Sequence, residues 1–160
     1  MSTVTCPLID FIKHFESFSP TVYVCPGGLR TIGYGHVLQP GDKLQSVTRA
    51  KAEAMLRDDL FKVRCAIARL IKVPLAPYQM DALTSFTFNV GTGALQASRL
   101  RQCVNEENHD EACEEFMRWV FAGGRKLKGL VHRRTLEALW YQNQLKTLSV
   151  KGFSVEDLAS

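Results

Sequence analysis

The 160-residue sequence lacks the features that mark secreted and membrane-spanning chains. Its N-terminal segment has no basic stretch followed by a continuous apolar run, because Asp10, Lys13 and His14 interrupt the apolar residues, so we expect no signal peptide. No later segment approaches the roughly 18 apolar residues of a transmembrane helix. The sequence therefore predicts synthesis in the cytoplasm and no stable association with a membrane.

Cysteines are few and their pattern does not suggest disulfides or metal binding. The chain has 5, an odd number that cannot pair completely within one chain, and none forms a C-x-x-C motif. Cys103, His109 and Cys113 are close in sequence, but a zinc site would need a fourth ligand. We expect Cys103 and Cys113 to be buried helix residues, all five thiols to be reduced, and no metal or cofactor to be required.

Internal repeats, low-complexity tracts and long linkers are also missing, so residues 1–160 are expected to form one domain. A hydrophobic content of 46% is enough for a core without disulfides. The net charge of +4 is compatible with nucleic acid, an anionic membrane or a cell-wall polymer, and equally with solubility alone. The densest basic stretch, 125–134, lies in no nucleic-acid-binding motif, so nucleic acid is not an expected partner.

The first part of the chain is expected to form a helix followed by a hairpin. Apolar residues recur at helical spacing over 7–17, where Glu16 falls in the last turn and Ser19-Pro20 should end the helix. Residues 21–25 alternate as a strand, 26–28 form a turn and 29–34 return. Gly33 and Gly35 are expected where a ligand or another backbone passes closely.

The rest of the chain is expected to be helical. The longest helix should cover 47–70 and end before Pro74, and a helix at 78–89 is apolar on nearly every side and should be buried. Further helices are expected at 97–104, 110–120 and 130–145, with Gly123-Gly124 breaking the chain between the last two.

Three residues are candidates for a catalytic site: Glu16, Cys25 and Thr31. The negative end of the helix dipole near Glu16 disfavours the charged carboxylate, which suits a proton donor. A glycosidase needs such a donor, because the departing sugar oxygen must be protonated as its bond breaks. On these grounds alone, a solvated surface glutamate is the simpler interpretation.

Three segments resemble the phage-type lysozyme family, to which endolysins belong. The signature of that family is Glu, eight residues, Asp or Cys, five residues and Thr, and Glu16, Cys25 and Thr31 match it without a gap. The text TIGYGH, which begins at Thr31, continues the match. Segments 79–91 (QMDALTSFTFNVG) and 129–140 (GLVHRRTLEALW) extend the resemblance over most of the chain.

The resemblance implies a mostly helical α+β fold of the lysozyme type. A small N-terminal lobe with a β-hairpin, about 7–46, would be joined by a long helix, about 47–71, to a helical C-terminal lobe, about 72–160. The substrate cleft would lie between the lobes. Such enzymes hydrolyse the β-1,4 bond between N-acetylmuramic acid and N-acetylglucosamine in peptidoglycan. By resemblance, Glu16 is the general acid, Cys25 assists attack on the anomeric carbon, and Thr31 positions the attacking water.

Cys25 stands where many members of the family have Asp, which leaves the stereochemistry open. Water attack would invert the anomeric configuration, the outcome we favour, whereas covalent attack by sulfur would retain it. Two alternatives to hydrolysis also stay open. A lytic transglycosylase would use the sugar's own hydroxyl, and a binding module of this fold would grip peptidoglycan without cutting it.

The resemblance also implies further cleft residues. Val37, Phe88, Asn89 and Ser98 are expected to contact substrate, and His36 is expected to serve a structural ion pair. One of Arg133 and Arg134 should reach Glu16, and the sequence does not say which.

As an endolysin, the protein is expected to cause host cell lysis. It would act as a monomer on the cell wall in the periplasm, after release from the cytoplasm by a separate holin-type protein.

Overall fold

The computed structural model describes residues 4–145, which form a mostly helical α+β fold. The helices are α1 (Cys6–Phe15), α2 (Arg49–Leu70), α3 (Pro77–Val90), α4 (Thr92–Ala97), α5 (Arg99–Asn105), α6 (His109–Phe116) and α7 (Lys128–Tyr141). The strands are β1 (Ser19–Val24), β2 (Arg30–Gly33), β3 (His36–Val37), β4 (Phe121–Ala122) and β5 (Arg125–Lys126).

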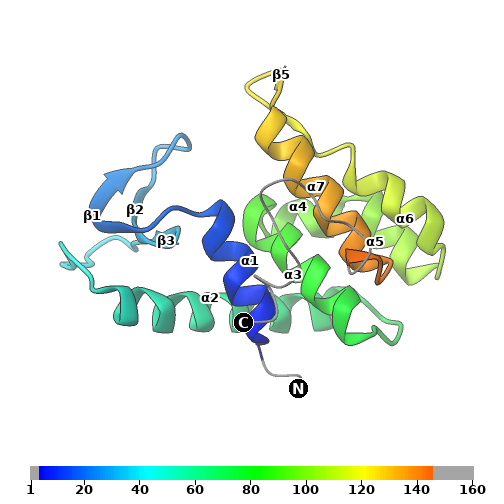
Figure 1. Ribbon diagram of the computed structural model, residues 1–160, viewed down its shortest axis with the longest axis horizontal. Helices are drawn as coiled ribbons and strands as arrows, with labels where there is room; N and C mark the ends of the chain where they lie inside the picture. The colour runs from blue at the N-terminus through cyan, green and yellow to red at the C-terminus, as the bar shows by residue number, and fades with distance from the viewer. Residues whose placement is uncertain (1–3, 146–160) are drawn as a thin grey trace.

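Two lobes are joined by α2 (Figure 1). The sheet β1-β2-β3 covers one end of α2, and α3 to α7 gather around its other end. Helix α1 lies between the two groups and contacts both α2 and α3. This arrangement confirms the fold expected from the sequence. In the part of the chain that the structure describes, no helix is long and apolar enough to span a membrane.

Helix α1 is buried as its pattern predicts, and Thr5 caps its N-terminus. The Thr5 hydroxyl accepts a hydrogen bond from the Leu8 backbone, and Phe11 and Ile12 are fully buried. The helix ends at Phe15, one residue before Glu16, whose backbone is extended. Ser19-Pro20 does not end it, contrary to expectation, because Ser19 already pairs with Gly33 in the sheet.

The N-terminal sheet brings strand residues from the predicted hairpin together. In β1 and β2, Tyr23 pairs with Thr31, and in β2 and β3, Thr31 pairs with Val37. Gly33 has φ +67°, and a Cβ added there would lie 3.0 Å from the Ala52 Cβ on α2. The close approach predicted at Gly33 is therefore to a side chain of α2. The lack of a side chain at Gly33 lets the sheet pack directly against this helix.

The two long helices follow their apolar patterns. Leu56, Leu60 and Ile67 of α2 are buried, and α3 buries Leu83 and Phe86 against α7 and neighbouring helices. Cys103 and Cys113 are buried helix residues, as expected. None of the five cysteines, all within residues 4–145, forms a disulfide.

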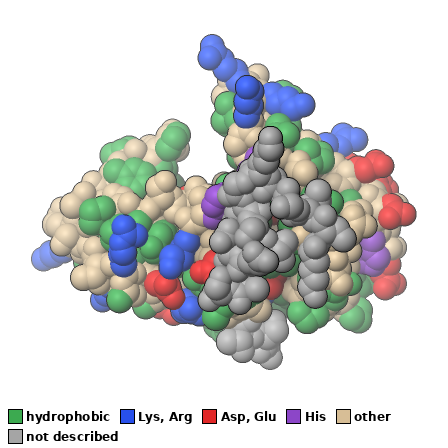
Figure 2. Space-filling model, viewed as in Figure 1, with side chains coloured by type: hydrophobic (Ala, Val, Ile, Leu, Met, Phe, Trp, Pro, Cys, Tyr) green, Lys and Arg blue, Asp and Glu red, His purple; other side chains and the backbone are tan. Residues whose placement is uncertain are grey.

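Short elements differ most from the expectation. Helix α4 was not predicted, and the break at Gly123-Gly124 is the turn of a small hairpin, β4–β5. Both glycines have positive φ, which a tight hairpin turn favours. Lys and Arg side chains gather at the projecting tip that this hairpin forms (Figure 2). Arg133 and Arg134 are buried, so the basic stretch 125–134 is not one continuous surface patch.

Candidate active site

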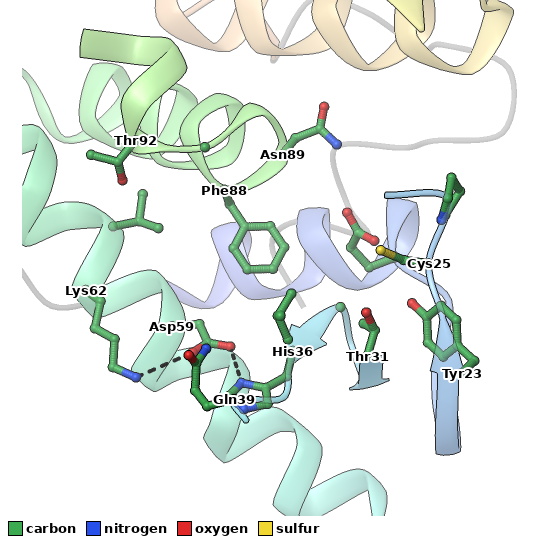
Figure 3. Close-up of a pocket in the computed structure, with 16 residues that line it drawn as sticks. Tyr23, Cys25, Thr31, His36, Gln39, Asp59, Lys62, Phe88, Asn89 and Thr92 are labelled. Carbon is green, nitrogen blue, oxygen red and sulfur yellow. Dashed lines mark hydrogen bonds and ion pairs between the residues drawn. The ribbon is translucent and has the colours of Figure 1, made fainter. Parts of the chain in front are cut away.

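A cleft of about 1020 Å³ contains most of the residues expected in the site. Glu16, Cys25, Thr31, Val37, Phe88 and Asn89 line it. In Figure 3, Tyr23, Cys25 and Thr31 lie at one end of the cavity, and Asp59, Lys62 and Thr92 lie toward the other. The cleft therefore joins residues from the sheet with residues from α2 and α3.

Glu16 is held at the end of α1 by an arginine from α7. Arg133 Nη1 donates to Glu16 Oε1 over 3.1 Å, and the Arg133 guanidinium lies 5.2 Å from the Phe15 ring centroid. The Glu16 side chain is 25% exposed, so it is open to the cleft while one oxygen is fixed. The structure thus answers which of the two adjacent arginines contacts the acid.

Gly35 allows the sheet to approach Glu16 closely. A Cβ added at this position would lie 3.4 Å from Glu16 Oε2 and 3.7 Å from the Phe88 ring. Its φ of +77° is a conformation that side-chain-bearing residues rarely adopt. The close approach expected at Gly35 is therefore to the side chain of the candidate acid.

Cys25 follows β1 and is surrounded by hydrogen-bond donors that stabilise its thiolate. The backbone N–H of Leu29 is the main cause, and the Thr31 hydroxyl adds to it, so the pKa of Cys25 lies below its ordinary value. In the structure the single Thr31 hydroxyl proton is donated to the Leu29 carbonyl over 3.0 Å. Donation to sulfur requires this hydroxyl to rotate, which links the ionisation of Cys25 to the orientation of Thr31.

Tyr23 also lines the cleft, although neither the sequence patterns nor the family resemblance indicated it. Burial, followed by the negative charges of Glu16 and Cys25, raises its pKa above the ordinary value, so its hydroxyl stays protonated. The side chain is 38% exposed and lines the same cleft. Strand periodicity could have revealed it, because Tyr23 and Cys25 are two residues apart and share one face.

The far wall of the cleft contains an ion-pair chain from the sheet to α2. His36 Nδ1 lies 2.6 Å from Asp59 Oδ2, and Lys62 Nζ lies 3.7 Å from Asp59 Oδ1. The resemblance implied an acidic partner for His36, and the hydrogen bond to Asp59 supplies one. Asp59 and Lys62 gave no sequence signal, because charged residues on the exposed side of a helix are ordinary.

Ser98 is the predicted substrate contact that the structure does not place along the cleft. It caps α5: its hydroxyl accepts from Arg101 N over 3.1 Å and donates to the Leu95 carbonyl over 2.7 Å. The side chain is 5% exposed. By contrast, Asn89 is exposed at the cleft, and its Oδ1 accepts a hydrogen bond from Arg134.

Within residues 4–145, no group of three or more His, Cys, Asp or Glu side chains is arranged to hold a metal ion. The chemistry that the cleft can perform with its own groups is proton transfer by Glu16 and activation of a small nucleophile near Cys25 and Thr31.

Alkylation with iodoacetamide should modify Cys25 well before Cys103 and Cys113. Its pKa is lowered by backbone and hydroxyl donors, whereas burial raises the pKa of Cys103 and raises that of Cys113 to about 11. Because the thiolate is the reactive form, the rate at Cys25 should reach half its maximum at a lower pH than the rate of an ordinary cysteine thiol. Peptide mass spectrometry across a pH series measures this, and earlier modification of Cys103 or Cys113 would contradict it.

Known proteins of similar sequence and structure are phage lysins and muramidases. An endolysin of Bacillus phage B103 is 39% identical over 144 residues, covering 88% of this chain and 55% of the relative. A SAR-endolysin of Escherichia phage Mu is 39% identical over 128 residues, covering 79% of this chain and 74% of the relative. The chain therefore spans about half the length of the first relative and three quarters of the second.

A solved structure, the muramidase domain of SpmX from Asticaccaulis excentricus, superposes with a TM-score of 0.79. It is 32% identical, and the match covers 88% of this chain and 98% of that domain. Residues 13–137 match the phage lysozyme family, a span that contains Glu16, Cys25, Thr31 and both arginines. With its predicted motif, fold and cleft in agreement, the chain belongs to the phage lysozyme family.

Proposed function

We propose that this protein is an endolysin that hydrolyses the β-1,4 bond between N-acetylmuramic acid and N-acetylglucosamine in peptidoglycan. The observation that carries the proposal is the placement of Glu16, held by Arg133 in a cleft that also contains Cys25 and Thr31. The names of the relatives, endolysin, SAR-endolysin and muramidase domain, support it.

In the proposed reaction, Glu16 donates its proton to the glycosidic oxygen as the bond to the muramic acid breaks. Arg133 fixes one carboxylate oxygen, which leaves the other for the substrate. Fixing the acid before the substrate arrives reduces the reorganisation needed in the transition state.

The attacking water is proposed to bind between Thr31, Cys25 and Tyr23. The Thr31 hydroxyl donates its hydrogen bond to the Leu29 carbonyl, so its oxygen can accept a hydrogen bond from water. The Cys25 sulfur can accept a hydrogen bond from the second water O–H, and its thiolate form, which the lowered pKa favours, takes up that proton as the water attacks. The protonated Tyr23 hydroxyl can donate to the water oxygen. Together these groups supply the charge and orientation that Asp supplies in other members of the family.

Water attack from this position predicts inversion at the anomeric carbon. The first products should carry α-configured muramic acid ends, because the broken bond is β. Proton NMR during the first minutes of digestion, before mutarotation, measures the anomer. An initial β product would show retention and would move Cys25 from a water-holding to a covalent role.

The proposal is tested by adding the purified protein to purified peptidoglycan and following turbidity and sedimentation together. Loss of turbidity with release of soluble glycan fragments would support an enzyme. Co-sedimentation of the protein with an intact wall, with no release of fragments, would show a binding module and contradict the proposal.

We further propose that a monomer acts on the wall in the periplasm, after release from the cytoplasm by a separate holin-type protein. Expression in the bacterial cytoplasm, with and without a co-expressed membrane pore, tests the route. Lysis only with the pore would support it, whereas lysis by this chain alone would contradict it.

A further inference from the structure

Glu137 is a fully buried carboxylate on α7 with three charged or polar donors. Its Oε1 accepts from Arg133 Nε over 3.1 Å and from Ser85 Oγ over 2.6 Å. Its Oε2 accepts from Arg134 Nη1 over 2.6 Å. Burying a carboxylate is costly unless it is paired and hydrogen-bonded, and each oxygen of Glu137 meets that condition.

Both arginines that Glu137 binds contact side chains that line the cleft. Arg133 Nη1 donates to Glu16, and Arg134 Nη2 donates to Asn89 Oδ1. Residues 133 and 134 lie four and three positions before 137 on the same helix, a spacing that places their side chains beside it. One buried carboxylate is therefore in contact with both guanidinium groups that touch cleft residues.

Other contacts complete the orientation of each arginine. Arg133 Nη2 lies 3.3 Å from the Ser85 carbonyl oxygen, and Arg134 Nε donates to the Trp119 carbonyl over 3.1 Å. The Arg134 guanidinium also lies 5.0 Å from the Phe86 ring centroid. These neighbours set where the guanidinium groups lie, but Glu137 is the negative charge shared by the two.

The charges in this cluster balance only when Glu137 is counted. Two guanidinium groups lie side by side, and the carboxylates in contact with them are Glu137 and Glu16. Tyr23 on β1 and Cys25 just after it also act electrostatically within the cleft, and Tyr23 interacts directly with Glu16. Without the charge of Glu137, more positive charge would act on Glu16.

We propose that Glu137 is a positioning residue for the general acid, which acts through Arg133 by fixing its orientation and by offsetting its charge. This inference rests on the proposed function. It assigns Glu137 an effect on the reaction, although its side chain lies outside the cleft lining. Ser85 on α3 donates a hydrogen bond to Glu137 and accepts one from Arg133, so it helps to hold both side chains in place.

The test is the pH dependence of kcat/KM on peptidoglycan for Glu137→Gln and Glu137→Asp. Glutamine keeps the shape but removes the negative charge beside Arg133, so more net positive charge acts at Glu16. We expect the high-pH decline of kcat/KM to move down by roughly half a pH unit or more, with kcat about tenfold lower. Glu137→Asp keeps the negative charge, so the pH profile of kcat/KM in this variant should match that of the wild type.

Glu115→Gln provides the matched control. Glu115, on α6, is also a buried carboxylate paired with an arginine: Arg118, in the turn that follows α6, lies 2.8 Å away, and Glu115 is not among the cleft residues. Its loss should change thermal stability without moving the pH profile. A Glu137→Gln protein that is folded and has the wild-type pH profile would overturn the inference.

If Glu137→Gln does not fold, Ser85→Ala and Glu137→Asp decide the question. Ser85→Ala removes one contact to Glu137 and one to Arg133 while it keeps every charge. A severalfold lower kcat with unchanged KM in Ser85→Ala would support positioning, and unchanged kcat in both variants would overturn it. Lack of cleavage by the wild-type protein would instead refute the proposed function.

Discussion

Replacement of Glu16 by glutamine is expected to lower kcat/KM on peptidoglycan by about 10³-fold or more. General acid catalysis contributes roughly 10²–10⁴-fold in enzymes, and glutamine cannot donate the proton that the departing sugar oxygen requires. The carboxamide is almost the same size and can still accept the hydrogen bond from Arg133. The variant should therefore fold and bind peptidoglycan as the wild type does, and initial rates of fragment release measure the loss.

Glu53→Gln is the control for this substitution. Glu53 lies on α2, is partly exposed, and pairs with Lys13 and Arg57, each at 3.0 Å. It does not line the cleft, so its replacement should leave the rate within about twofold while changing stability by no more than ~1 kcal/mol. A Glu16→Gln enzyme that keeps more than a tenth of the wild-type rate would remove Glu16 from the role of general acid.

Replacement of Phe86 by alanine is expected to lower the free energy of unfolding by about 3–5 kcal/mol. Phe86 is fully buried on α3, its ring centroid lies 5.3 Å from that of Phe116, and it packs edge-on against Trp119 at 5.4 Å. The substitution removes these contacts and leaves a cavity beside the Arg134 guanidinium. Denaturant unfolding of both proteins measures the difference.

Phe121→Ala makes the same chemical change on the surface. Phe121 is 60% exposed in the β4–β5 hairpin, so its loss should change the free energy of unfolding by no more than about 0.5 kcal/mol. Equal effects of the two substitutions would mean that α3 is not packed in the core as described.

Local patterns predicted the elements that carry Glu16, Cys25 and Thr31, and the family resemblance predicted that these residues form a site. Glu16 at the end of a helix, Cys25 at the end of a strand and Thr31 on the returning strand follow from periodicity, and the structure places all three along one cleft. Strand β3 has two residues, too few for a period to be detected. For the same reason, the six-residue helix α4 could not be predicted.

Groups that meet only through tertiary packing were not predictable in the same way. Adjacent residues on a helix point about 100° apart, so the sequence could not decide between Arg133 and Arg134 without the position of α1. Glu137 resembles any other glutamate on a helix until α3 and both arginines surround it. For Ser98, the family resemblance predicted a contact with substrate in the cleft. In the structure this serine caps α5.

Identification of the new chain ends after digestion of purified peptidoglycan in ¹⁸O-labelled water tests the central claim most directly. In the wild-type digest we expect reducing N-acetylmuramic acid ends that carry one ¹⁸O atom at the anomeric carbon, formed about 10³-fold or more slowly by Glu16→Gln. Anhydro-muramic ends without the label would show a lytic transglycosylase, and reducing N-acetylglucosamine ends would show cleavage of the other glycosidic bond. Either result would contradict the account.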